Sequence, residues 1–464
     1  MKFVSTRKGF EATSAESVFQ GLAPDGGLYV PSSVKADASL PRFENLREAA
    51  EYVLSKLFDD LPASVRTDAV DRLLSRFPEG DPIPLVDADG FKILELFHGP
   101  TGAFKDVALS VLPVLMVAAA KKINGDKMKK VLILTATSGD TGSAAMAGFS
   151  NVPGVEVAVF FPNTGTSRIQ RLQMTTPSAP NVHGIAIRGN FDDAQAAVKR
   201  IFSSKEMNDA AKAAGVTLSS ANSINTGRLV PQIAYYLLSA AKLKGAEFDV
   251  VVPSGNFGNI LAAYYAKLLG APIKTLVLAA NVNRVLDGFV TDGTYDPRPE
   301  LVVTNSPSMD IRKSSNVERL LWLLNKGNPD AVNDLFNELQ SSGVYHLQPD
   351  AVEELKKSFV SGFATQEETE EEMNRMHEAC GYVLDPHTAV ATCVARKLGF
   401  PKGRPCVIAA TATPYKFPET CAHAFSKDIL TRPPKSFADL ETASVTQTKV
   451  VDVDEIDDAV RSLF

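Results

Sequence analysis

The chain has little of several features that mark particular classes of protein. It contains only four cysteines among 464 residues, and none of them forms a C-x-x-C pair. This excludes the usual zinc and disulfide frameworks. We expect the cysteines to be buried, reduced thiols of a cytoplasmic protein. The six histidines are scattered along the chain, so no metal site is expected.

Basic charge and long apolar runs are also scarce. The chain has 48 Lys and Arg residues against 54 Asp and Glu residues, a formal net charge of −6, which argues against a nucleic-acid partner. Its longest apolar run, residues 107–120, is too short to span a bilayer and contains Pro113, so a buried helix and no membrane partner are predicted. Residues 1–7 lack the apolar region of a signal peptide.

Periodicity indicates an α/β protein of two or three domains. Residues 44–58 and 64–77 have apolar residues at helical spacing, and the proline-rich residues 77–84 are typical of a linker. Further along, short β-branched runs alternate with helical stretches, which predicts largely parallel sheets. The predicted strands are residues 92–97, 131–137, 155–161, 182–187, 216–219, 249–253, 274–279 and 406–410.

Five polar or glycine-rich stretches follow predicted strands, where parallel sheets bind ligands. They are residues 98–106, 137–143, 222–228, 254–259 and 410–416. In the first, Lys105 opens an otherwise apolar helix. It is either a surface lysine with a buried stem or a desolvated amine that forms a Schiff base. Phe104 replaces the glycine that a Walker loop needs before its lysine.

Three of the other stretches, residues 137–143, 222–228 and 254–259, suit anions, and Thr411 would point from a strand end into the same cleft. Glycines in residues 254–259 let the backbone approach a phosphate, and the order is not that of a dinucleotide site. Arg228 suits a phosphate or carboxylate, although most arginines are simply exposed. Taken alone, each stretch also has a structural explanation as a helix cap or an ordinary turn, and for residues 222–228 an exposed arginine is the favoured one. Together the five stretches favour a cofactor with one phosphate and a doubly anionic substrate.

These motifs resemble the threonine synthases of the long bacterial and fungal type, which belong to the fold-type II (tryptophan synthase β-like) pyridoxal-phosphate (PLP) enzymes. The resemblance covers essentially the whole chain, and residues 98–106 are its most specific match. It implies two parallel-type α/β domains and a mostly helical N-terminal domain. The implied ranges are 1–84 for the N-terminal domain, 85–130 with 221–464 for the large PLP-binding domain, and 131–220 for a small inserted domain.

The resemblance also implies roles for individual residues. Lys105 would be the catalytic residue that carries PLP covalently, Thr411 would meet the pyridine nitrogen, and Asp140 the 3′-oxygen. Many fold-type II relatives have Asn where this chain has Asp140, whereas the long threonine synthases keep Asp. The other implied cofactor-binding residues are Ser254, Gly255, Asn256, Phe257, Gly258 and Asn259. The implied substrate-binding residues are Ser138, Thr141, Ser223, Asn225 and Arg228.

The implied reaction converts O-phospho-L-homoserine and water to L-threonine and phosphate by a PLP-dependent β,γ-replacement, the last step of threonine biosynthesis. A serine/threonine dehydratase or a phospho-lyase of the same fold is the nearest alternative. A catalytically silent relative that only binds ligands is a second one, against which the intact Lys105 and Thr411 argue. We expect a cytoplasmic monomer or homodimer.

Overall fold

The computed structural model describes residues 1–125, 130–425 and 429–464. Its strands are β1 (Lys2–Ser5), β2 (Glu11–Thr13), β3 (Tyr29–Pro31), β4 (Leu85–Ala88), β5 (Phe91–Glu95), β6 (Lys130–Ala136), β7 (Val155–Pro162), β8 (Val182–Arg188), β9 (Val216–Ser220), β10 (Phe248–Pro253), β11 (Ile273–Ala280), β12 (Thr294–Tyr295), β13 (Tyr345–His346), β14 (Phe359–Phe363), β15 (Cys406–Ala410) and β16 (Lys449–Asp452). Each of the eight predicted strands is confirmed, with shifts of one or two residues at the ends.

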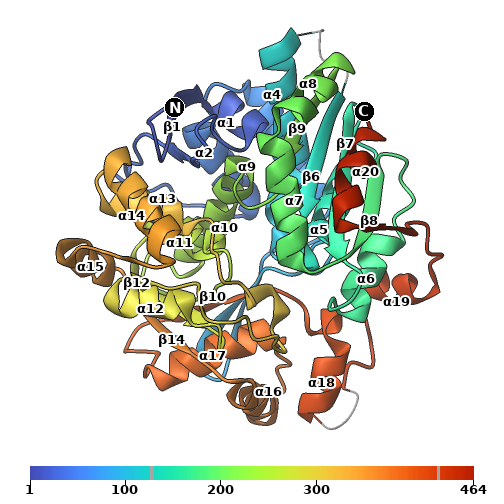
Figure 1. The fold of residues 1–464 in the computed structure, drawn as a ribbon. Coiled ribbons are helices and arrows are strands. Elements are labelled where there is room, and N and C mark those ends of the chain that lie inside the picture. Colours follow the sequence, from blue (N-terminus) through green and yellow to red (C-terminus); the bar gives the residue numbers. More distant parts are fainter. Residues whose placement is uncertain (126–129, 426–428) are drawn as a thin grey trace.

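Helices separate most of these strands along the chain (Figure 1). They are α1 (Ser14–Gln20), α2 (Leu46–Leu57), α3 (Ala63–Ser75), α4 (Lys105–Asn124), α5 (Asp140–Phe149), α6 (Arg168–Thr175), α7 (Phe191–Ser203), α8 (Lys205–Ala213), α9 (Thr226–Leu229), α10 (Ile233–Lys242), α11 (Gly258–Leu268), α12 (Val285–Asp292), α13 (Val317–Leu324), α14 (Pro329–Ser342), α15 (Pro349–Lys356), α16 (Gln366–Cys380), α17 (Pro386–Lys397), α18 (Pro418–Phe425), α19 (Lys435–Thr442) and α20 (Ile456–Arg461). Short 3₁₀ turns add η2 (Val230–Gln232), η3 (Pro307–Met309), η4 (Pro414–Lys416) and η5 (Val453–Glu455).

The larger sheet has the strand order β14-β11-β10-β15-β5-β4. Adjacent strands in this sheet are parallel, except that β4 runs antiparallel to β5. Successive residues point to opposite faces, so both faces of a central strand can be apolar. In β10, Val250 and Val252 belong to the core that contains α10 and α11, whereas Val251 belongs to the core that contains α16 and α17.

The second sheet has the order β16-β8-β7-β6-β9 and is parallel throughout. Helix α5 covers one face, and α7, α8 and α20 cover the other (Figure 1). The C-terminal strand β16 pairs with β8. Residues 449–452 therefore lie in the sheet of the predicted small domain, which corrects their assignment to the large domain. The other predicted domain borders stay predictions.

The N-terminal region contains a sheet that the sequence did not reveal. Strands β2, β1 and β3 form an antiparallel sheet of short strands, too short for a clear alternating pattern. The predicted helices are confirmed as α2 and α3, and residues 77–84 form neither helix nor strand, as expected of a linker. This region packs on α4 and α10, so its core is continuous with that of the larger sheet.

Helix α4 confirms the buried helix predicted at residues 107–120, with Pro113 inside it. No helix in the described ranges is long and apolar enough to cross a membrane. The same ranges contain no group of three or more His, Cys, Asp or Glu side chains that could hold a metal ion. All four cysteines are free, but Cys380 is exposed, which corrects the expectation that every thiol is buried.

A glycine sets the close approach of α4 and α5. A Cβ atom added to Gly148 would collide with the backbone carbonyl oxygen of Leu109. We therefore expect Gly148→Ala to destabilise the fold by about 1–3 kcal/mol through overpacking, seen as a lower thermal unfolding midpoint. The control is Gly288→Ala in α12, where the added Cβ meets Thr294 at an ordinary 3.4 Å. Equal midpoints for the two variants would contradict this packing.

Candidate active site

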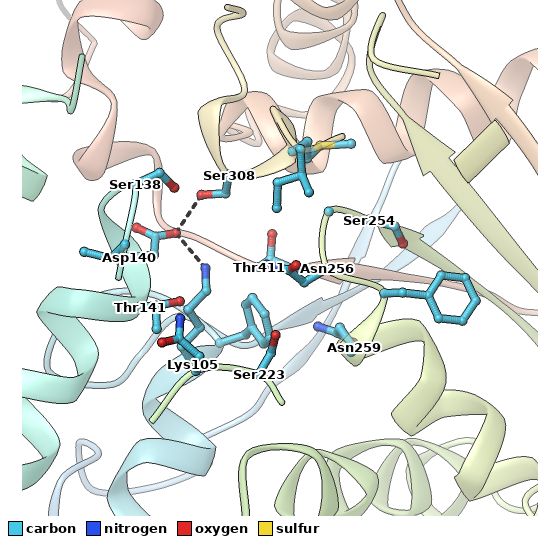
Figure 2. A pocket seen from close by; sticks show the side chains of 18 of the residues that line it. Lys105, Ser138, Asp140, Thr141, Ser223, Ser254, Asn256, Asn259, Ser308 and Thr411 are labelled. Atoms are coloured by element: carbon cyan, nitrogen blue, oxygen red, sulfur yellow. Dashed lines mark hydrogen bonds and ion pairs between the residues drawn. The ribbon is translucent and has the colours of Figure 1, made fainter. Parts of the chain in front are cut away.

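The five predicted loops meet at one pocket between the two sheets (Figure 2). Each loop follows the carboxyl end of a parallel strand and leads toward a helix or 3₁₀ turn, as is usual for α/β ligand sites. The predicted residues that line the pocket are Lys105, Ser138, Asp140, Thr141, Ser223, Arg228, Ser254, Gly255, Asn256, Phe257, Gly258, Asn259 and Thr411. Residues separated by more than 300 positions thus share one surface.

Backbone contacts place Lys105 at the start of α4. The N–H of Phe104 donates to the carbonyl oxygen of Thr411 at 2.9 Å, beside a bridge between Ala103 and Ala412. These contacts join the loop after β5 to the loop after β15. In Figure 2 the Lys105 side chain reaches into the pocket toward Asp140 and ends 3.3 Å from Oδ2 of that residue.

Asp140, at the first position of α5, holds a buried negative charge surrounded by donors. Its Oδ1 atom lies 2.8 Å from Nζ of Lys416 and 2.9 Å from Nε2 of Gln170. Its Oδ2 atom accepts hydrogen bonds from Lys105 and, at 3.0 Å, from the hydroxyl of Ser308. One buried carboxylate therefore faces two ammonium groups.

This arrangement shifts the pKa of both partners. Burial favours the neutral form of Lys105 and lowers its pKa; the carboxylate of Asp140 opposes that effect, and the cations Lys416 and Arg228 reinforce it. Burial alone would favour a neutral Asp140, but the ammonium groups of Lys416 and Lys105 outweigh it and hold the pKa of Asp140 well below its usual range. The site thus combines a fixed anion with a lysine that loses its proton readily.

The loop after β10 and the start of α11 have the features of a phosphate cradle. The first N–H groups of a helix lack intrahelical partners, and Phe257 supplies no side-chain cap for α11. Phe257 itself adopts φ 62°, a left-handed conformation rare for a bulky residue and held here by burial. Nδ2 of Asn259 is buried without a hydrogen-bond partner among the described residues, while its Oδ1 accepts from Tyr236.

Ser254 differs from its neighbours in this loop. Its hydroxyl donates to the carbonyl oxygen of Val252 at 3.1 Å, so this side chain is hydrogen-bonded to the backbone at the end of β10. A glycine is required at the next position, because a Cβ on Gly255 would lie 2.5 Å from the carbonyl oxygen of Ser308.

Arg228 is a buried cation that lines the same pocket from α9. It is 3% exposed, and burial lowers the pKa of its guanidinium to about 10. The guanidinium donates to the carbonyl oxygen of Ala221, and its Nε has no partner in the described part of the chain. A buried cation with an unpaired N–H group is suited to an anionic ligand.

Asn225 does not line the pocket, contrary to the prediction. Its Oδ1 caps α9 through the N–H of Gly227, and its Nδ2 donates to the carbonyl oxygens of Val18 and Ser220. These bonds use both N–H donors of the side-chain amide and one acceptor position of its oxygen. Asn225 therefore holds the short helix that carries Arg228 instead of facing a ligand.

Several residues at the site carry no signal that singles them out in the sequence. Lys416 lies in the predicted stretch 410–416, but only Thr411 was singled out there. Ser308 and His387 also line the pocket, and no sequence motif marks them. Nε2 of His387 accepts the N–H of Ser308 at 3.1 Å, and Nδ1 pairs with Asp385 at 2.8 Å, so this histidine fixes the turn η3.

Arg319 is a further residue without a sequence signal. Its fully buried guanidinium donates to the carbonyl oxygens of Tyr29, Ser223 and Ile224 and to Oδ1 of Asn316. Nδ2 of Asn316 donates in turn to the carbonyl oxygen of Asn256. One side chain thereby joins the N-terminal region to the loop after β9 and, through Asn316, to the phosphate cradle.

Comparison with known proteins defines the class. A family model described as pyridoxal-phosphate dependent enzyme matches residues 79–412. The fold, the buried lysine and the cradle agree with this match, and the protein is a fold-type II PLP-dependent enzyme. Models for the threonine synthase N terminus and the threonine synthase C-terminal region match residues 2–72 and 388–461. The chain belongs to the threonine synthase family of PLP-dependent lyases.

Individual relatives agree with this assignment. The chain is 35% identical to threonine synthase of Saccharomyces cerevisiae, over 94% of this chain and 93% of the relative. It is 38% identical to threonine synthase of Pseudomonas aeruginosa, over 91% and 90%. The PLP-bound threonine synthase structure from Brucella melitensis superimposes with a TM-score of 0.91 at 34% identity, covering 100% of this chain and 99% of that one.

The cradle residues fit the phosphate of PLP, since a glycine and an unpaired Asn259 amide face the pocket beside a helix N-terminus. Substituting Gly255 tests this fit. We expect Gly255→Val to weaken PLP retention, because its side chain would displace the turn that carries Ser308. The measurement is PLP titration of the cofactor-free protein, with Gly288→Ala as the control. Unchanged PLP affinity in Gly255→Val would contradict a role for this loop.

Proposed function

We propose that this enzyme converts O-phospho-L-homoserine and water to L-threonine and phosphate. The observation that carries the proposal is that one pocket holds both Lys105, whose largely buried amine contacts Asp140, and the buried Arg228, whose Nε has no partner among the described residues. The lysine suits proton transfer at the substrate Cα. The arginine suits a substrate phosphate.

The cofactor would lie between Lys105 and the cradle. Residues 254–259 and the start of α11 would hold its phosphate, with Thr411 at the pyridine nitrogen and Asp140 near the 3′-oxygen. Thr411 is a neutral hydroxyl, so it would leave the ring nitrogen less fully protonated than a carboxylate would. PLP, when bound, supplies an electron sink for negative charge that develops on the substrate.

The remaining residues would act on the substrate. Lys105 would take the Cα proton, and its lowered pKa makes the neutral, proton-accepting form accessible. Arg228, with the hydroxyls of Ser223 and Thr141, would stabilise the leaving phosphate, and Ser138 would help to orient the amino acid. A second proton would leave Cβ as the phosphate leaves Cγ. Protons would then return to Cγ and Cα, and the hydroxyl group of water would add at Cβ to give threonine.

A phospho-lyase or dehydratase of the same fold uses the same cofactor chemistry. The buried Arg228 favours a phosphorylated substrate over free serine or threonine. Addition of water at Cβ, in place of release of a 2-oxo acid, distinguishes a threonine synthase from a phospho-lyase or a dehydratase. We further propose a cytoplasmic monomer or homodimer, consistent with four free cysteines.

Lys105→Ala tests the cofactor link. Without the Nζ atom, the reconstituted protein should lose the absorbance band of lysine-bound cofactor and nearly all turnover. Lys121→Ala is the matched control, because that lysine is exposed at the other end of α4. An intact band in Lys105→Ala would refute the assignment.

Arg228→Ala tests the substrate phosphate site. Loss of a charged hydrogen-bond donor should raise KM for O-phospho-L-homoserine, lower kcat, and reduce kcat/KM roughly 10- to 100-fold. Arg228→Lys keeps the positive charge but loses the several N–H donors of the guanidinium. Its kcat/KM should therefore lie between those of Arg228→Ala and the unmodified enzyme. Thermal unfolding of both variants separates this effect from misfolding. Kinetics equal to those of the unmodified enzyme would move the phosphate site elsewhere.

A further inference from the structure

A second lysine is buried at the cofactor site and has no part in the proposed reaction. Lys416, at the end of η4, is 0% exposed. Its ammonium group donates to the carbonyl oxygen of Thr101 at 2.9 Å and lies 2.8 Å from Oδ1 of Asp140. Burying an ammonium is costly unless it is paired, so the position of Lys416 requires a partner of opposite charge.

The two lysines contact different oxygens of the same carboxylate. Lys416 faces Oδ1 together with Gln170, whereas Lys105 faces Oδ2 together with Ser308. The Lys416 contact is the shorter, 2.8 Å against 3.3 Å. The charges of Asp140 and Lys416 thus cancel within one buried pair, without any contribution from Lys105.

We propose that Lys416 is a positioning residue, the standing counter-ion of Asp140, which leaves Lys105 free to act as a neutral amine. The inference rests on the proposed covalent role of Lys105. Without Lys416, the single negative charge of Asp140 would bind the Lys105 ammonium and hold its proton. With Lys416 present, a proton on Lys105 adds a second, uncompensated positive charge to the site.

The charged and titratable groups around Lys105 come from its own helix and from four other elements. Asp140 faces it from α5, Lys416 from η4 and Arg228 from α9, and the last two lower its pKa. Asp106, the next residue of α4, interacts with Lys416 and Arg228. His387 from α17 lines the same pocket.

The neutral form of Lys105 matters because only an amine with a free electron pair can attack an aldehyde, here the aldehyde group of added PLP. The Nζ atom adds to the aldehyde carbon and a C=N bond forms. Both hydrogens of the amine leave with the aldehyde oxygen as water. The step needs no oxidant or further reactant.

The test follows this reaction in the full-length protein freed of cofactor. PLP is added across a pH series, the C=N bond is followed by absorbance, and borohydride reduction with peptide mapping confirms Lys105 as the site. Lys416→Met should raise the midpoint of the pH dependence of C=N bond formation by about one pH unit or more. Below that midpoint, the bond should form about tenfold more slowly for each unit that the pH falls. Lys416→Arg should keep a midpoint near that of the unmodified protein.

Asp140→Asn provides a second, independent test, because it removes a negative charge where Lys416→Met removes a positive one. Removing the anion while Lys416 remains should lower the midpoint, and the double variant Lys416→Met/Asp140→Asn should return it toward the original value. A purely structural role for Lys416 would reduce PLP affinity without moving the midpoint. That result in Lys416→Met overturns the proposal.

If Lys416→Met does not fold, an unshifted midpoint in Asp140→Asn overturns the proposal equally. A failure of the covalent role proposed for Lys105 is distinguishable from both results. In that case the unmodified protein would trap no cofactor at Lys105 at any pH.

Discussion

The burial of one carboxylate constrains the arrangement of the whole site. Asp140 begins α5, and its hydrogen-bond partners come from α4, α6, η3 and η4. A buried charge is tolerated only when it is paired and hydrogen-bonded, so these segments must keep their positions together. Because these segments follow strands of both large sheets, the carboxylate of Asp140 links the two halves of the fold at the cofactor site.

A second buried polar network stabilises the other wall of the pocket. Arg319 binds three backbone carbonyl groups and Asn316, and so joins the N-terminal region to the substrate and cofactor loops. Loops carry unsatisfied backbone groups and are mobile by default. Apolar cores on both faces of the sheets fix the strands, while Asp140 and Arg319 fix the loops at their ends.

The sequence was sufficient for the parts of the structure that depend on local pattern. Strands such as β6 and β10 are apolar runs bounded by turns, and the helix that Lys105 opens is marked by its apolar residues. Strand β16 was missed because its pairing with β8 joins residues more than 250 positions apart. Strands β1 to β3 were missed because three or four residues carry too little periodicity.

The same distinction applies to the site. Lys105 and the loop 254–259 stand out because a lysine opening an apolar helix and clustered glycines are unusual in any context. Asn225 was predicted from its place in a polar stretch, but a cap and a ligand contact have the same local sequence. Lys416, Ser308 and Arg319 act through contacts with distant segments, which only the folded chain reveals.

The central claim is that Lys105 and the buried Arg228 act together to convert O-phospho-L-homoserine to threonine. Its most direct test is to incubate the PLP-loaded protein with O-phospho-L-homoserine and to quantify threonine and phosphate in the same sample. The account predicts equal amounts of both. Phosphate with a 2-oxo acid in place of threonine would contradict it and make the enzyme a phospho-lyase.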